Sequence, residues 1–96
     1  MLFAIICTDK SGALDLRMQT RPEHVAYLKS LGSALKAAGP FLDNDAKPMG
    51  SLVIVAADDR SGAESIAAND PYAKADLFQA VEIRAWNWTL NNPEAS

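Results

Sequence analysis

The single histidine of the sequence, His24, is the first candidate for chemistry. An imidazole has an unperturbed pKa of about 6.5, so it can act as a general base or a general acid near neutral pH. On a helix with about 100° between successive residues, His24 lies on the same apolar stripe as Leu28 and Leu31. A titratable ring on a core-facing stripe suggests a proton-transfer residue. The alternative is a first-turn histidine that makes an ordinary hydrogen bond.

Two arginines, Arg17 and Arg21, stand shortly before this histidine. Their planar guanidinium groups could hold the carboxylate or phenolate of a small ligand through paired hydrogen bonds. The alternative is a salt bridge to Asp15, to Glu23 or to an acidic residue of a partner subunit. The first interpretation predicts an anionic small molecule as the ligand.

Two hydroxyl groups complete the candidate site. Ser51 follows Gly50 at the start of an apolar segment and could hydrogen-bond a ligand, but no glycine-flanked elbow surrounds it as a nucleophile would require. Tyr72 is expected to be a wall of the site or a hydrogen-bond donor to the ligand. Its alternative is packing beneath a helix.

Nothing in the sequence predicts a metal or a cofactor. Asp43 and Asp45 stand in a turn-rich segment without further ligands at suitable spacing, which is typical of turn formers. One histidine and one cysteine cannot build a zinc cluster within one chain. A glycine-rich phosphate-binding loop is also absent from the sequence. We therefore expect chemistry without metal or cofactor.

A long helix has to position His24. Thr20 and Glu23 have the spacing of a capping box, and Pro22 is tolerated in a first turn. Gly39 suits the left-handed residue that ends a helix, and Pro40 prevents continuation. These signals predict a helix between Thr20 and Pro40.

The strands follow from the apolar pattern. Residues Leu2–Thr8 and Ser51–Ala57 are apolar on both alternating sets, which predicts two central strands. Ala80–Trp88 alternates between apolar and polar residues, as an edge strand does. A further short strand is expected at Gly39–Leu42, and Asp9–Gln19 reads as a connecting loop with at most one helical turn.

A second helix is expected after the second central strand. Ser61 and Glu64 repeat the capping-box spacing. Asp70 precedes Pro71, so the helix cannot continue past it, and the aspartate could cap a further turn through residues 72–78. The order of elements is then that of the ferredoxin-like βαββαβ fold, an α+β fold with a four-stranded antiparallel sheet.

This fold leaves one face of the sheet without helices. Two helices can cover only one face, whereas the central strands offer apolar side chains to both. The second face therefore needs a partner. We predict a homodimer that packs sheet against sheet.

Composition and charge exclude other classes of function. The 96 residues are 49% apolar and 22% charged, which is typical of one folded domain, 1–96, with residues 89–96 expected to fray. The net charge is -3 and the nine Lys and Arg are dispersed along the chain, so no nucleic-acid partner is expected.

The apolar opening segment predicts a strand and not a membrane anchor. LFAIIC is too short to span a bilayer and has no basic leader. We therefore expect no membrane partner and a cytoplasmic location. Cys7, the only cysteine, is expected to pack in this strand as a small hydrophobic residue.

A combination of residues along nearly the whole chain is similar to a known family. The residues are Arg17, Arg21, Pro22, His24, Tyr27, Leu28, Gly39, Pro40, Gly50, Ser51, Asp70, Pro71, Tyr72 and Trp86. In this combination the chain resembles the YciI-like (YCII-related) proteins. The resemblance implies the dimeric α+β barrel architecture, in which two ferredoxin-like subunits join their sheets around an enclosed space.

The resemblance also implies a catalytic pair. Family members are thought to place a histidine and an aspartate together, and His24 and Asp70 occupy the matching positions. A carboxylate on one ring nitrogen would fix the tautomer and leave the other nitrogen to face a substrate. The alternative for Asp70 is an ordinary N-cap.

Two functions remain open on the sequence. The first is an enzyme of lyase or isomerase type, which uses the His24–Asp70 pair for cofactor-free proton transfer on a small polar or aromatic acid held by Arg17 or Arg21. The second is a non-catalytic module that binds a metabolite or supports another enzyme. Fold alone does not separate them.

Overall fold

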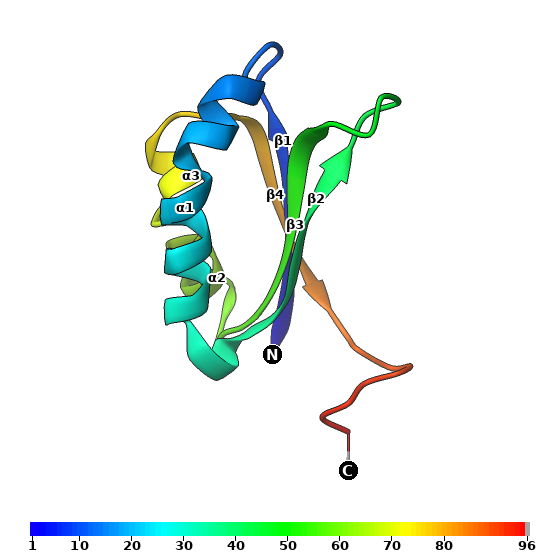
Figure 1. The fold of residues 1–96 in the computed structure, drawn as a ribbon. Coiled ribbons are helices and arrows are strands. Elements are labelled where there is room, and N and C mark those ends of the chain that lie inside the picture. The colour runs from blue at the N-terminus through cyan, green and yellow to red at the C-terminus, as the bar shows by residue number, and fades with distance from the viewer. Residues whose placement is uncertain (96) are drawn as a thin grey trace.

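The computed structural model describes residues 1–95 as a four-stranded antiparallel sheet with helices packed on one face (Figure 1). In chain order the elements are β1 (Leu2–Asp9), α1 (Leu14–Ser30), a 3-10 turn (Gly32–Ala34), β2 (Leu35–Leu42), β3 (Pro48–Ala56), α2 (Arg60–Ala68), α3 (Pro71–Lys74) and β4 (Phe78–Trp86). The strand order is β2-β3-β1-β4. The predicted ferredoxin-like fold is confirmed, and the helical turn predicted after Asp70 forms the short helix α3 between α2 and β4.

The two strands that are apolar on both sides occupy the centre of the sheet, as predicted. β1 pairs with β3 in antiparallel register, with Ile5 opposite Val53 and Phe3 opposite Val55. These side chains face the helices and form most of the core with Cys7. Burial raises the pKa of the Cys7 thiol to about 12, so the thiol stays neutral and packs as a small apolar group.

The long helix begins earlier than predicted. α1 starts at Leu14, so Thr20 lies inside the helix and caps nothing, and the expected loop over residues 9–19 is wrong in its second half. Pro22 is tolerated inside because the carbonyl that it leaves without an intrahelical donor belongs to Met18, whose side chain is half exposed. His24 is consequently a mid-helix residue and not a first-turn residue.

The helix also ends earlier than predicted. α1 stops at Ser30, and Gly32 follows with a φ of 60°. A glycine just past the last turn accepts this left-handed conformation without the steric cost of a Cβ. Gly32 therefore ends the helix, and residues 35–42, predicted as helix and a shorter strand, form the full edge strand β2.

Aspartates cap both later helices. Asp70 caps α3 as predicted, with its side chain accepting from the backbone N–H of Tyr72. The cap of α2 was predicted wrongly: Asp59, not Ser61, accepts from the N–H of Gly62. α2 also joins α1 through the Tyr27 hydroxyl, which donates to the Ile66 carbonyl at 2.8 Å.

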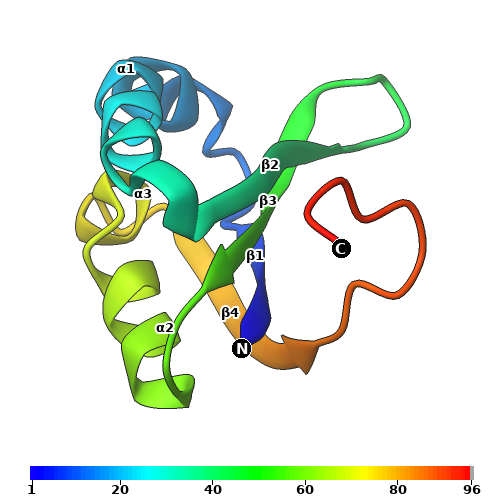
Figure 2. The same cartoon turned by 90° about the horizontal axis from the view of Figure 1, so that it is seen from below.

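The second face of the sheet carries no helix, and Figure 2 shows the C-terminal segment on this side. Leu2, Ile6 and Leu52 point to this face and are half-buried. After β4, residues 87–95 form no further helix or strand, and an ion pair of 2.9 Å joins Glu94 to Lys36 of β2. That residues 89–96 fray stays a prediction, and Ser96 lies outside the described residues.

Within residues 1–95, α1 is the longest helix, and neither it nor any other helix is long and apolar enough to cross a membrane. The predicted cytoplasmic location is not tested by this finding and stays a prediction.

Candidate active site

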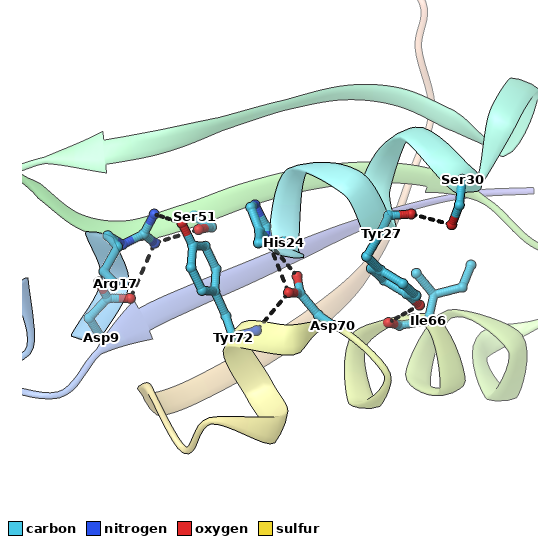
Figure 3. Close-up of polar contacts among 9 residues, drawn as sticks. All are labelled: Asp9, Arg17, His24, Tyr27, Ser30, Ser51, Ile66, Asp70 and Tyr72. Carbon is cyan, nitrogen blue, oxygen red and sulfur yellow. Dashed lines mark hydrogen bonds and ion pairs between the residues drawn. The ribbon is translucent and has the colours of Figure 1, made fainter. Parts of the chain in front are cut away.

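His24 and Asp70, which are 46 residues apart in the chain, meet beneath α1 (Figure 3). His24 Nδ1 lies 2.8 Å from Asp70 Oδ1 and 3.0 Å from Oδ2. Both residues are buried, with exposed fractions of 8% and 6%. The carboxylate is held firmly because Oδ1 also accepts the N-capping hydrogen bond of α3 at 2.9 Å.

This geometry selects one imidazole tautomer. A carboxylate only accepts hydrogen bonds, so the proton of a neutral imidazole belongs on Nδ1 and the lone pair on Nε2. His24 lines a cavity, whereas Asp70 lies behind it and does not. The edge of the ring that carries Nε2 is therefore the one available to a ligand, which is the arrangement of a general base with its orienting carboxylate.

Tyr72 holds the imidazole from the side. The two rings stack with 3.9 Å between centroids and an interplanar angle of 18°. The Arg17 guanidinium carbon lies 4.6 Å from the centroid of the tyrosine ring, which stands between Arg17 and His24 in Figure 3. Burial raises the pKa of the Tyr72 phenol, while the charges of Arg17 and Arg21 oppose this rise. The net effect keeps the phenol neutral, so its hydroxyl can donate.

Arg17 is fixed by groups of the protein. Its Nε donates to Asp9 Oδ2 at 2.7 Å, and Nη2 donates to Asp9 Oδ1 at 3.3 Å and to Ser51 Oγ at 2.5 Å. Only 4% of Arg17 is exposed. The salt-bridge alternative is thus realised with Asp9 and not with Asp15 or Glu23. Nη1, which donates to the Tyr72 hydroxyl over 3.5 Å, is the group with capacity left for a ligand.

Asp9 is the residue that the sequence analysis missed. It lies at the end of β1 and is buried. A signal was present, because alternation along the strand places residue 9 on the same side as the core residues Phe3, Ile5 and Cys7. An acid on a core-facing position needs a buried cation, and the nearby arginines were the candidates.

A cavity of about 330 Å³ lies between α1 and the strands β2 and β3. Its polar and charged lining comes from Arg17, Arg21, His24, Lys29, Ser51 and Tyr72. Five of the six predicted site residues therefore line one space, and the sixth, Asp70, supports His24 from behind. Three cations and no carboxylate line the cavity, so its lining favours an anionic ligand.

The acids outside the cavity have structural partners. Asp43 Oδ1 accepts from the backbone N–H groups of Asp45 and Lys47 at 2.8 and 3.0 Å, and these bonds lower the pKa of Asp43. This is the predicted role of a turn former. In residues 1–95, no three His, Cys, Asp or Glu side chains come together as a metal site.

The fold and the site together define a ferredoxin-like α+β protein of the dimeric α+β barrel superfamily, with a buried histidine and aspartate beside a cationic cavity. The family model of the YCII-related domain matches residues 1–87. The chain belongs to this family.

Its relatives include proteins of known sequence and of known structure. The chain is 32% identical over 92 residues to Protein YciI of Escherichia coli O6:H1. This match covers 88% of this chain and 94% of the relative. Among solved structures, it is similar to 5-chloro-2-hydroxyhydroquinone dehydrochlorinase (TftG) from Burkholderia phenoliruptrix AC1100, in complex with 2,5-dihydroxybenzoquinone. The TM-score is 0.85 and the identity 33%, over 96% of this chain and 99% of that one.

More distant structures share the fold alone. An antibiotic biosynthesis monooxygenase superposes with a TM-score of 0.58 at 18% identity, over 93% of this chain and 99% of that one.

Proposed function

We propose that the protein is a small-molecule enzyme in which His24, oriented by Asp70, transfers protons without a cofactor. The observation that carries the proposal is the placement of the ring: Nδ1 is held by both carboxylate oxygens, and the same side chain lines the cavity. An orienting carboxylate of this kind fixes the tautomer and leaves the lone pair of the opposite nitrogen to face a substrate.

The substrate that best fits the cavity is a small aromatic ring with acidic hydroxyl groups. Arg21, at the exposed side of the cavity, would attract the phenolate, and the Ser51 and Tyr72 hydroxyl groups would orient the ring oxygens. The similarity to TftG supports this class, because that enzyme is named for a chlorinated hydroxyhydroquinone and was crystallised with a dihydroxybenzoquinone. It also favours the lyase type over the isomerase type.

The proposed reaction removes HX from a hydroxylated ring that carries a leaving group X beside one hydroxyl. His24 Nε2 takes the proton of that hydroxyl, and the oxygen electron pair forms a C=O bond while the adjacent carbon, which bears X, receives the proton. Loss of a second hydroxyl proton then forms the other C=O bond, shifts a ring double bond and expels X as an anion. The products are a quinone, a proton and the leaving anion, so the ring supplies its own oxidising equivalent.

The test is turnover of a chlorinated hydroxyhydroquinone, followed by chloride release and quinone absorbance. General-base catalysis contributes roughly 10²- to 10⁴-fold, so His24→Gln should lower kcat by at least about 10²-fold. Glu23→Gln, at the exposed neighbouring residue of the same helix, is the matched control and should leave kcat unchanged.

One result of this test bears on the role of His24, and another decides between the two functions. Chloride release that survives His24→Gln would overturn the role of the histidine. Binding of the ring compounds without any turnover by the wild-type protein would instead favour the non-catalytic metabolite-binding module.

The proposal includes a homodimer formed through the open face of the sheet. Beside the half-buried Leu2, Ile6 and Leu52, this face presents Phe41 and Trp86, which are 38% and 40% exposed. Such a row of apolar side chains gains free energy when a second copy removes it from water. Light scattering at micromolar concentration should give twice the mass of the chain, and a monomer there would refute the dimer.

A further inference from the structure

The cavity is longer than a single ring requires. Its lining residues on α1 run from Arg17 to Lys29, a distance of about 18 Å at about 1.5 Å per helical residue. On the facing strand β2 the lining runs from Leu35 to Pro40, which is roughly 17 Å at about 3.3 Å per residue. Two independent elements thus give the same length. The cavity is a slot between α1 and β2, and His24 lies near its middle.

The chemistry of the slot changes along its length. On the Arg17 side of His24 the slot carries the hydroxyl groups described above, beside the apolar Met18, Pro40 and Pro48. Beyond His24 the walls are Val25, Leu28 and Ala38, which offer no side-chain hydrogen bonds. The far end is marked by Lys29, a cation again.

The charges of the three cations are not equally available. Arg17 is neutralised by Asp9 through a buried ion pair of 2.7 Å. Within residues 1–95, neither Arg21 nor Lys29 has an ion-pair partner. Along α1 these two residues are about 12 Å apart, on either side of His24. The slot can therefore hold two separate anionic groups.

Resting on the function proposed above, we infer that the natural substrate is a hydroxylated ring that bears a short saturated arm ending in a carboxylate. The ring lies at His24, the arm follows the apolar walls at Val25 and Leu28, and the carboxylate is bound by Lys29. Lys29 is then a specificity-determining residue that selects armed rings over bare ones.

A structural role for Lys29 would also explain its position. It lies in the last turn of α1, where a positive charge interacts favourably with the helix dipole. Lys74 occupies the equivalent place in α3, is exposed and does not line the cavity. Lys74→Gln is therefore the matched control for a charge lost from a helix C-terminus.

The experiment measures the binding of three ligands by calorimetry: 2,5-dihydroxybenzoquinone, its ring-linked propanoate derivative and the corresponding propanamide. The propanamide has the same shape as the propanoate but no charge. In the wild-type protein the propanoate should bind about fivefold more tightly than the propanamide, the scale of one partly exposed ion pair. Lys29→Gln should abolish this preference, Lys29→Glu should reverse it, and Lys74→Gln should leave it intact.

The affinity of the bare ring serves to separate the two proposals. It should not change in Lys74→Gln, and in the Lys29 variants it should change much less than the affinity of the propanoate does. Turnover of bare rings without a preference for the propanoate, or a preference that survives Lys29→Gln, would overturn the role of Lys29 and leave the proposed function standing. If the wild-type protein binds none of the three ligands at millimolar concentration, both proposals fail.

Discussion

Two buried side-chain pairs, the Arg17–Asp9 ion pair and the hydrogen-bonded His24–Asp70 pair, lie under the same helix, and they differ in which groups each leaves available to a ligand. The Arg17–Asp9 pair and the His24–Asp70 pair have similar burial and similar separations, 2.7 and 2.8 Å. Arg17 donates three hydrogen bonds to Asp9 and Ser51. His24 uses only one ring nitrogen, Nδ1, to bind Asp70, and its ring borders the cavity.

The difference separates a positioning role for Arg17 from a proton-transfer role for His24. A guanidinium has no proton to exchange near neutral pH and no acceptor, so Arg17 can position its neighbours and donate to a ligand through Nη1, but it cannot transfer a proton. An imidazole with one nitrogen anchored keeps a defined lone pair on the other. Tyr72 connects the two pairs, because it contacts Arg17 on one side and stacks on His24 on the other.

The largest expected effect on stability comes from breaking the Arg17–Asp9 ion pair. Arg17→Met leaves the Asp9 carboxylate buried without a cation, which costs about 3–5 kcal/mol for pairs of this kind. We expect a loss of about 3 kcal/mol in the free energy of unfolding, measured by urea denaturation.

A double variant tests the physical reason for that loss. Asp9→Leu combined with Arg17→Met removes both charges, so the double variant should be more stable than Arg17→Met alone. If the double variant is less stable, the loss comes from packing and hydrogen bonds to Ser51 and Tyr72, not from an orphaned carboxylate.

Breaking the His24–Asp70 pair should lower the activity strongly and the stability much less. Asp70→Asn keeps an oxygen that can cap α3 but offers Nδ1 no negative charge, and its amide can turn to donate to Nδ1 and stabilise the wrong tautomer. We expect kcat to fall by about 10²-fold or more, while the free energy of unfolding changes by roughly 1 kcal/mol. The two measurements are chloride release and urea denaturation.

Asn69→Ala provides the neighbouring control. Asn69 is the C-cap of α2 and is exposed, and within residues 1–95 its side chain hydrogen-bonds only to Ser65. It should change stability slightly and kcat not at all. Equal losses of kcat in the Asn69 and Asp70 variants would show that the activity reports loop geometry and not the carboxylate.

The fold was readable from the sequence because its signals are local. Double-sided apolar segments placed β1 and β3 at the centre, and the Asp70–Pro71 step placed the cap of α3. The bounds of α1 were misjudged because Gly39 and Gly32 are both plausible helix ends. Pairing with β3, from Leu35 opposite Val55 onward, fixes residues 35–42 as a strand, and a local pattern does not contain that information.

The site was predictable only in part, for a related reason. The residues that line the cavity carry polar groups of obvious chemistry, and the family resemblance paired His24 with Asp70. Strand alternation signalled that Asp9 is buried, but the sequence did not show that Arg17 rather than Arg21 pairs with it, because the partners of Arg17 lie 8 and 34 residues away on two different strands. Which of the two arginines binds protein groups depends on how the strands are placed against the helix in the folded chain.

The smallest expected effect probes the core beneath both pairs at once. Burial is the main cause that raises the pKa of Cys7 to about 12, the charges of Asp70 and Asp9 raise it further, and Arg17 opposes them. In the unfolded chain the thiol has the ordinary cysteine pKa of 9.0. Because the folded state resists ionisation, the thiol does not lower the free energy of unfolding below pH 9. The free energy of unfolding falls as the pH rises from about 9 towards 12.

At pH 10 this ionisation should remove about 1 kcal/mol from the free energy of unfolding relative to pH 8. Cys7→Ala removes the thiol, so its loss between these two pH values should be smaller than that of the wild type by about this amount, as measured by urea denaturation. The comparison uses the change with pH in each protein, so the small cavity left by the substitution cancels. Equal changes in both proteins would mean that the thiol ionises as readily in the folded state, which requires water to reach the core under His24 and Arg17.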